Sequence, residues 1–257
     1  MGFVVTSQQQ RQFNEDGYLI VPNLLDERET TLLMTVAKSD RASLDGAYAK
    51  KDASGGESRL VVHNDLDHSP YAAIVRSQRI VMAMQSLLDD EVYHYHHKMM
   101  LKEPLIGGAW EWHQDYGYWY DNGCLYPDMA SCLIAVDRAT KENGCLQVVR
   151  GSHKLGRLEH GKTGGQTGAN LDRVAEVLQR LELVYCELSP GDAIFFHGNT
   201  LHRSDQNKSQ HSRWSLICCY NTKHNDPYIE SKHPNYEPLE IWNDQDVAEH
   251  LKSHLSE

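Results

Sequence analysis

Residues 111–119 read Glu-Trp-His-Gln-Asp-Tyr-Gly-Tyr-Trp, so His113 and Asp115 stand two positions apart. On a strand, positions i and i+2 point to the same face, and both side chains then reach one metal ion. A second histidine, His202, lies far downstream, and Arg213 follows it by eleven positions. Two histidines and one carboxylate form the facial ligand set of non-haem Fe(II) oxygenases, which leaves positions open for O2 and a co-substrate.

Arg213 has a natural partner in this arrangement. The planar guanidinium grips a carboxylate with two hydrogen bonds, so Arg213 is predicted to hold the far carboxylate of a 2-oxo diacid chelated to the iron. A His-x-Asp pair alone is weak, because exposed strands carry such pairs by chance. Together with the third ligand and the arginine, it predicts an Fe(II)/2-oxoglutarate oxygenase.

The chain resembles the phytanoyl-CoA dioxygenase-like (PhyH) family, whose pattern is His-x-Asp, a distal histidine and an arginine about eleven residues later. The resemblance runs from about residue 13 to about residue 220. Beyond the ligands, it includes the opening strand and turn, an Asn-Gly-x-Leu stretch ending in Gly-Ser-His, and the turn before the distal histidine, at residues 13–18, 21–25, 142–146, 150–154 and 189–192.

The resemblance implies a function. His113, Asp115 and His202 are expected to bind Fe(II), with 2-oxoglutarate as co-substrate and O2 as oxidant. The enzyme is expected to hydroxylate a C–H bond of a small polar metabolite and to release succinate and CO2. Family members that halogenate have a small residue in place of the carboxylate, so Asp115 implies hydroxylation and not halogenation. Desaturation and epoxidation remain alternatives.

Two further residues are candidates for binding 2-oxoglutarate. Ser204 matches a family position that hydrogen-bonds the co-substrate carboxylate beside the arginine; its alternative is an ordinary strand serine. Lys98 lies in the strand before the His-x-Asp loop. A lysine inside a barrel needs an anion, here 2-oxoglutarate or an acidic substrate, unless it extends to solvent.

Candidate substrate contacts flank the ligands. Gln114 either contacts a substrate or simply faces outward. The aromatic residues that follow Asp115 either line a substrate pocket or belong to the core. These candidates are Gln114, Tyr116, Tyr118 and Trp119. Three other histidines, His94, His96 and His97, are interpreted as a strand surface. His197 lacks the serine and arginine that follow His202, so His202 is preferred as the ligand.

The remaining pattern predicts a mainly β protein with flanking helices, a double-stranded β-helix of the jelly-roll or cupin-like type. Asp26 and Glu29 form a capping box for one helix, and Ser69-Pro70 opens a second. Strands are expected at residues 93–101, 131–136, 145–149, 184–188, 193–196 and 214–220. Residues 1–257 are expected to form one domain, with an insertion at about 155–182 that is either a lid or a surface loop.

The amino-acid composition limits the classes of binding partner that we expect. With 25 basic against 36 acidic residues the net charge is −11, and no dense basic run suggests nucleic acid or an anionic membrane as a partner. A small-molecule substrate is expected, and the oligomeric state is left open. Six cysteines without Cys-x-x-Cys spacing indicate buried free thiols in the cytoplasm.

Two other functional classes stay open. The barrel is either a non-catalytic binding or sensing module, or a cupin-type metalloenzyme that needs no 2-oxo acid. Arg213 and Ser204 favour the oxygenase over both. The substrate itself is not indicated, because loops that vary on a shared scaffold build the pocket.

Overall fold

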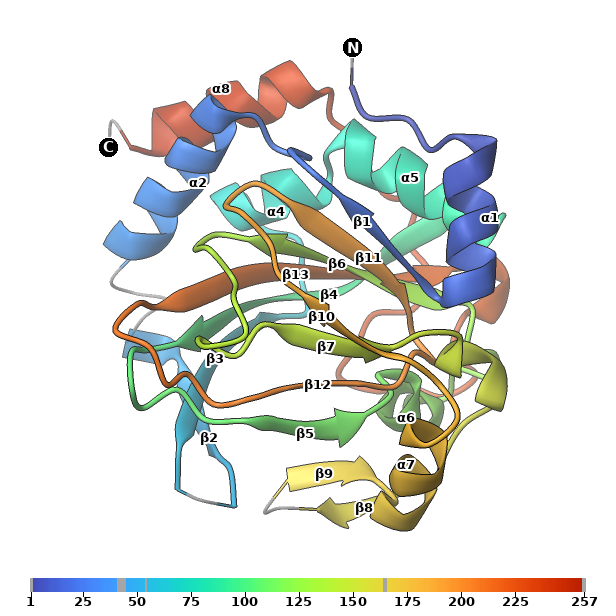
Figure 1. The fold of residues 1–257 in the computed structure, drawn as a ribbon. Coiled ribbons are helices and arrows are strands. Elements are labelled where there is room, and N and C mark those ends of the chain that lie inside the picture. The colour runs from blue at the N-terminus through green and yellow to red at the C-terminus, as the bar shows by residue number, and fades with distance from the viewer. Residues whose placement is uncertain (1, 41–44, 54, 164–165, 256–257) are drawn as a thin grey trace.

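Two antiparallel sheets face each other in the computed structural model, which describes residues 2–40, 45–53, 55–163 and 166–255 (Figure 1). The large sheet has the order β1-β11-β6-β13-β4-β3-β2, and the small sheet β10-β7-β12-β5. The strands are β1 (Tyr18–Val21), β2 (Tyr48–Lys51), β3 (Glu57–His63), β4 (Val92–Lys102), β5 (Trp110–His113), β6 (Met129–Ala135), β7 (Leu146–Val149), β8 (His160–Thr163), β9 (Gln166–Ala169), β10 (Leu183–Cys186), β11 (Ala193–His197), β12 (His202–Ser204) and β13 (Arg213–Thr222). This arrangement confirms the predicted barrel.

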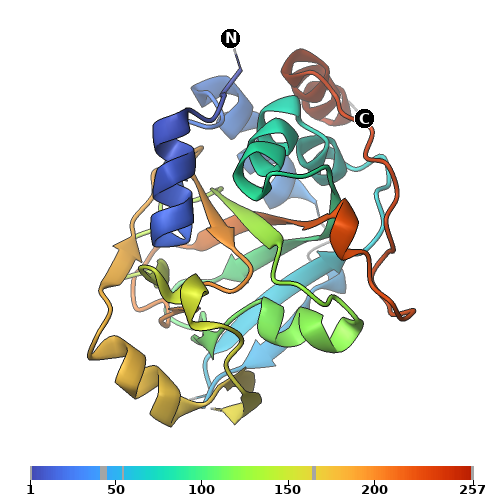
Figure 2. The ribbon, with the colours of Figure 1, turned by 90° about the vertical axis from the view of Figure 1, so that its right-hand side faces the viewer.

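Helices cover the outer face of the large sheet, as Figures 1 and 2 show, except that α6 and α7 lie away from that face. The helices are α1 (Ser7–Asp16), α2 (Glu27–Ser39), α4 (Pro70–Val75), α5 (Gln78–Leu88), α6 (Tyr116–Trp119), α7 (Leu171–Leu178) and α8 (Asp244–His254), with the 3-10 turns η1 (Tyr120–Asn122), η2 (Ser152–Leu155) and η3 (Lys223–Asn225). The predicted capping box opens α2, where Glu29 N donates to Asp26 Oδ1 at 2.8 Å. None of the described helices combines the length and apolarity needed to cross a bilayer.

The helix predicted to begin at Ser69-Pro70 is two helices, α4 and α5. Between them, Ser77 has an extended backbone (ψ 127°) and pairs with Trp242. Gln78 N donates to Trp242 O at 2.8 Å. A contact with a distant residue therefore breaks a run whose apolar spacing is helical.

Strand β13 shows why the central strands are almost continuously apolar. Trp214, Leu216 and Cys218 point to the helices, while Ile217 points into the barrel. Both faces of the strand are buried, so the alternation of polar and apolar residues typical of a half-exposed strand is absent. A polar side chain on the inner face, such as Arg213, is then a candidate for function.

The insertion folds against the edge of the small sheet. It holds the hairpin β8–β9 and α7, which lie below β5 in Figure 1. Glu111 N donates to Gln166 Oε1 at 3.1 Å, and Tyr118 Oη donates to Thr167 O at 2.6 Å. The insertion therefore contacts the chain on both sides of His113.

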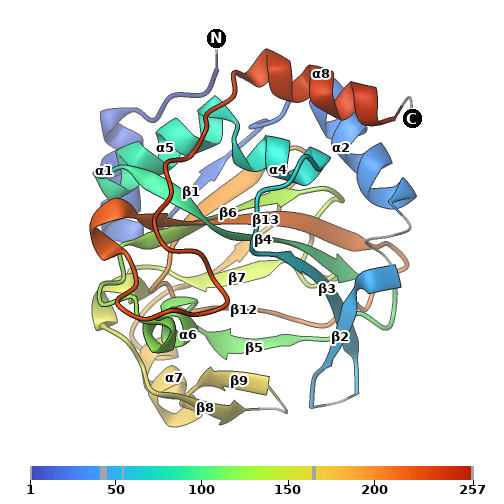
Figure 3. The same cartoon turned by 180° about the vertical axis from the view of Figure 1, so that it is seen from behind.

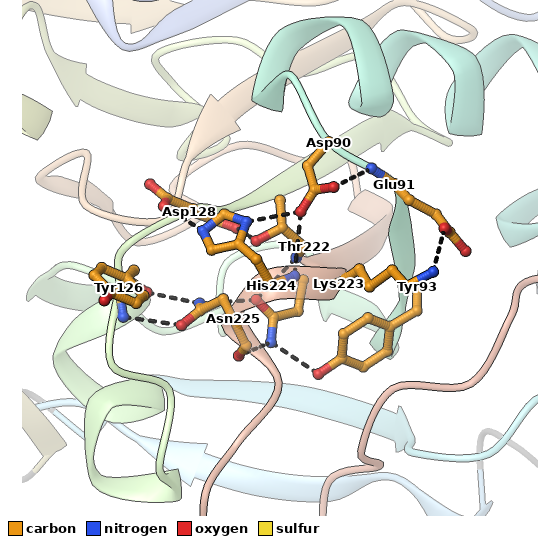
Figure 4. A network of polar contacts seen from close by, with 10 residues as sticks. Asp90, Glu91, Tyr93, Tyr126, Asp128, Thr222, Lys223, His224 and Asn225 are labelled. Carbon is orange, nitrogen blue, oxygen red and sulfur yellow. Dashed lines mark hydrogen bonds and ion pairs between the residues drawn. The ribbon is translucent and has the colours of Figure 1, made fainter.

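A polar network fastens the end of β13 (Figure 4). His224 Nδ1 lies 2.7 Å from Asp90 Oδ2, and its Nε2 lies 2.9 Å from Asp128 Oδ2. The hydrogen bond to Asp90, together with Asp128, raises the pKa of His224. From η3 the chain runs past α6 and returns to α8, as Figure 3 shows.

Candidate active site

His113 and His202 stand opposite each other on the paired strands β5 and β12. Asp115 Oδ1 lies 3.7 Å from His113 Nε2 and 3.9 Å from His202 Nε2. All three side chains are buried, and one ligand atom from each lies within 4.8 Å of the others. Within the described part of the chain, this is the one such group able to hold a metal ion.

Backbone carbonyls set the orientation of both imidazoles. His113 Nδ1 lies 2.7 Å from Glu111 O, and His202 Nδ1 lies 2.8 Å from Thr200 O. A carbonyl only accepts, so each Nδ1 donates and each Nε2 keeps its lone pair for a metal. Burial lowers the pKa of both histidines, which favours the neutral, metal-binding form. This donor set fits Fe(II).

Strand alternation does not explain the position of Asp115. Strand β5 ends at His113, and Asp115 has a helical backbone (φ −57°, ψ −41°) at the start of α6. Its carbonyl accepts from Tyr118 N at 3.0 Å. The carboxylate meets the histidines because the chain turns there, so the expected juxtaposition is present but the reason given for it is wrong.

Ser131, on β6, holds the second carboxylate oxygen. Its Oγ donates to Asp115 Oδ2 at 3.1 Å, while Asp115 Oδ1 faces the histidines. Cys219 Sγ lies 3.2 Å from the same hydroxyl, and burial raises the pKa of this thiol to about 12. The protonated thiol can then donate to Ser131 in turn. Sequence analysis missed Ser131, although a serine inside an apolar strand is a usable signal.

Arg213 is a buried cation that forms no ion pair with any residue in the described part of the chain. Its Nη2 donates to Gly144 O at 2.8 Å and its Nη1 to Ser215 Oγ at 3.3 Å, while Nε has no partner among the described residues. Burial lowers the pKa of Arg213 to about 10. A buried guanidinium with no hydrogen-bonded carboxylate is a receptor for an anion.

Gly144 explains the Asn-Gly motif. Its φ is +77°, in the left-handed region that favours glycine, and an added Cβ would lie 2.2 Å from Asp205 O. The turn directs its carbonyl to Arg213. The motif thus positions the Arg213 side chain through this hydrogen bond.

One cavity joins these groups. It opens partly to solvent, and the space not filled by atoms is about 440 Å³ when the open part is included. Its lining residues are Lys98, Met100, Trp110, His113, Asp115, Leu133, Leu146, Phe196, His202, Arg203, Ser204, Arg213 and Ile217. Ser204 therefore lines the same cavity as Arg213.

Lys98 lines the same cavity but at a distance from Arg213 along the sheet. Arg213 pairs with Lys102 of β4, while Lys98 pairs with Ile217, four residues further along. Four strand residues span roughly 13 Å. Burial opposes the charge of Lys98, yet the carboxylate of Asp115 keeps its pKa above the ordinary value. Lys98 thus lies toward the metal-binding end.

Gln114 has a structural role. Its Nε2 donates to Gly156 O at 2.9 Å and to Asn199 O at 2.8 Å, and its Oε1 accepts from Leu158 N at 2.7 Å. The side chain is fully buried, so the outward-facing alternative is wrong. Its amide is occupied by backbone groups, so the predicted substrate contact does not agree with the structure either.

The aromatic run divides between core and site. Tyr116 Oη donates to Leu125 O at 2.6 Å, and Trp119 packs edge-on against Tyr95 and His96; neither lines the cavity. The structure therefore favours the core interpretation for both. Tyr118 lies beside the site, with its ring centroid 5.5 Å from that of His113.

The other histidines do not join the candidate ligands. His94, His96 and His97 are buried, so their interpretation as a strand surface is wrong. His94 Nε2 lies 3.0 Å from His97 Nδ1. His197 accepts from Asn199 N at 3.1 Å and packs near Phe13.

Comparison with known proteins places these observations in context. A family model for phytanoyl-CoA dioxygenase (PhyH) matches residues 13–215. The L-proline trans-4-hydroxylase of Streptomyces griseoviridis is 28% identical over 232 residues, which cover 84% of this chain and 86% of that protein. The ectoine dioxygenase of Stutzerimonas stutzeri is 26% identical, with 90% of this chain and 85% of that protein covered.

Solved structures share the fold. EctD from S. alaskensis, crystallised with 2-oxoglutarate and 5-hydroxyectoine, superposes with a TM-score of 0.78 at 23% identity. The alignment covers 93% of this chain and 88% of that one. The same protein has also been solved with bound Fe. At this level of identity the superposition establishes a common barrel.

Proposed function

Because the chain belongs to the phytanoyl-CoA dioxygenase family of Fe(II)- and 2-oxoglutarate-dependent oxygenases, we propose that it hydroxylates a C–H bond of a small polar metabolite. Succinate and CO2 are the co-products. The observation that carries this proposal is that one cavity is lined both by the three candidate iron ligands and by Arg213, whose guanidinium has no hydrogen-bonded carboxylate among the described residues. The relatives named for proline and ectoine are in line with a small polar substrate.

The side chains divide the work. When bound, iron and 2-oxoglutarate supply the O2-dependent oxidation that couples decarboxylation to hydroxylation. We assign the iron to His113, Asp115 and His202, and the far carboxylate of 2-oxoglutarate to Arg213 and Ser204. The apolar cavity wall, which includes Leu133, Phe196 and Ile217, excludes water from the reacting groups. With Asp115 as the third ligand we expect hydroxylation and not halogenation.

A succinate-release assay with Fe(II), O2 and 2-oxoglutarate tests this function. Asp115→Ala should abolish turnover and weaken iron binding. Arg213→Met should raise the 2-oxoglutarate requirement by about 30- to 5,000-fold, because a buried anion that loses its charged partner costs roughly 2–5 kcal/mol. Arg138→Met removes an exposed arginine and is the control. Full activity of Asp115→Ala, or an unchanged requirement in Arg213→Met, would refute the assignment.

The same assay separates the alternatives. A sensing barrel would bind 2-oxoglutarate and release no succinate, and a metalloenzyme independent of 2-oxo acids would turn over without it. Mass spectrometry of the product should show one added oxygen atom derived from O2. A chlorinated product in chloride buffer would contradict the hydroxylase.

We also propose that the protein acts in the cytoplasm, as one domain over residues 1–257. Its six cysteines are all free and buried, which suits a reducing compartment. The insertion at 155–182 contacts the His-x-Asp loop, so it can serve as a wall or lid of the cavity.

A further inference from the structure

Lys98 carries a charge that the proposed cofactors do not balance. Among the described residues its ammonium group has no hydrogen-bond or ion-pair partner, and Asp115 is the carboxylate that most favours its charge. Once Asp115 binds a divalent metal, its negative charge is offset by the metal. Arg213 already takes the far carboxylate of 2-oxoglutarate. Lys98 therefore needs a further anion.

Lys50 contacts Trp110, which belongs to the wall of the same cavity. It is half-buried on β2, and its Nζ lies 4.7 Å from the ring centroid of Trp110, which lines the cavity from β5. Strands β2 and β5 are edge strands of the large and small sheets, so Lys50 spans the two sheets where their edges meet. Burial lowers the pKa of Lys50, and the charges of Lys98 and Lys232 lower it further. Lys98 in the cavity lining and Lys50 against Trp110 of the cavity wall thus lie on the same side of the site.

The C-terminal segment completes this region. His233 stacks on Tyr95 with a centroid distance of 4.5 Å and lies 5.1 Å from the ring of His96. The Nδ1 atoms of His96 and His233 are buried and have no partner among the described residues. Lys232 precedes His233 and is exposed. The segment thus places His233, and Lys232 beside it in the chain, against Tyr95 and His96 of β4, the strand that also carries Lys98.

This local excess of positive charge contrasts with the net charge of the whole chain, which is −11. Two other lysines form ion pairs, Lys38 with Asp137 at 2.9 Å and Lys223 with Glu91 at 2.9 Å. Within the described part of the chain, Lys50, Lys98 and Lys232 form no ion pair. An unpaired cluster at a cavity edge indicates a site for an anion.

We infer, building on the proposed function, that the primary substrate carries a small anionic group, a carboxylate or a phosphonate, bound by Lys50 and Lys98 with Lys232 at the rim. The anion then lies on the side of the iron centre away from Arg213. This placement orients the rest of the substrate toward the iron ligands.

Isothermal titration calorimetry under argon, with Fe(II) and 2-oxoglutarate present, tests this inference. The probes are small carboxylates and phosphonates, including L-proline and methylphosphonate, each paired with its amide or full ester, in which the acid group is uncharged. At least one anion should bind at least about tenfold more tightly than its neutral partner, and raised ionic strength should weaken it. A panel in which no anion binds, or in which the amides and full esters bind equally well, overturns the inference.

Variants locate the site. Lys50→Met should weaken binding of the anion about tenfold, and Lys232→Met by a smaller factor because this residue is exposed. Lys51→Met removes the same charge from the adjacent position of β2, whose side chain points to the opposite face, and should leave binding unchanged. Equal binding to wild type and Lys50→Met would place the anion elsewhere and refute the assignment.

A second readout separates this inference from the proposed function. Succinate released without any primary substrate reports the oxygenase reaction alone. Anion binding without succinate would overturn the proposed function and leave the anion site standing. Succinate release without anion binding would overturn the anion site and leave the proposed function standing.

Discussion

Ser131→Ala tests whether a residue outside the ligand set controls iron binding. The Ser131 hydroxyl donates to Asp115 Oδ2 at 3.1 Å, and both side chains are buried. Removing it leaves a carboxylate oxygen without its donor in a site that water does not readily fill. Asp115 then loses the hydrogen bond that directs Oδ1 toward the histidines.

The size of the effect follows from this geometry. A hydrogen bond to a charged group contributes about 1.5–3 kcal/mol, which corresponds to roughly 10- to 150-fold in affinity. Loss of a hydrogen bond that supports a metal ligand typically costs a similar 10- to 100-fold. We therefore expect Fe(II) to bind Ser131→Ala about 10- to 100-fold more weakly, and Ser131→Thr, which keeps the hydroxyl, to recover much of the loss.

Anaerobic calorimetric titration with Fe(II) measures this difference. Ser58→Ala is the matched control, because it also removes a buried serine hydroxyl, one that donates to Gly108 O at 2.7 Å and does not touch the ligands. Ser58→Ala should lower the free energy of unfolding without changing iron affinity. If both variants bind Fe(II) like wild type, Ser131 does not position Asp115.

Two further predictions concern the Gly144 turn that binds Arg213 and the polar network at η3. Gly144→Ala should destabilise the fold by about 1–3 kcal/mol and raise the 2-oxoglutarate requirement, because φ is +77° and the new Cβ meets Asp205 O. Denaturant unfolding and 2-oxoglutarate titration check this, with Gly55→Ala, at φ +86° in open space, as the control. His224→Asn should lower the free energy of unfolding below pH 6.5, where the imidazole is charged in both states, and progressively less as pH rises through its raised folded-state pKa. A pH-independent difference between His224→Asn and wild type would contradict this role.

The candidate ligands could be predicted because their signal is local and chemical. His113, Asp115, His202 and Arg213 have a spacing with few other uses, and the apolar strand runs place them in a barrel. The strand argument still failed for Asp115, because the turn into α6 is not visible in a pattern of alternation.

The features that could not be predicted from the sequence depend on contacts between segments that lie far apart in the chain. Ser131 becomes informative only when β6 brings it to Asp115, and Trp242 breaks a helix from far along the chain. His233 lies in a stretch without periodic pattern, yet it packs against Tyr95 of β4. Such partners follow from sheet order, which single-sequence reasoning does not supply.

The amide of Gln114 has a consequence for redesign of the enzyme. It ties the chain between the two first ligands to Gly156 and Leu158 of the insertion and to Asn199 before the distal histidine. The insertion is therefore not an independent module. Grafting a relative's insertion to broaden substrate scope will also disturb metal affinity, unless the graft preserves the Gly156 carbonyl and the Leu158 amide. In this barrel, a change in the insertion that alters substrate specificity is therefore expected to alter metal affinity as well.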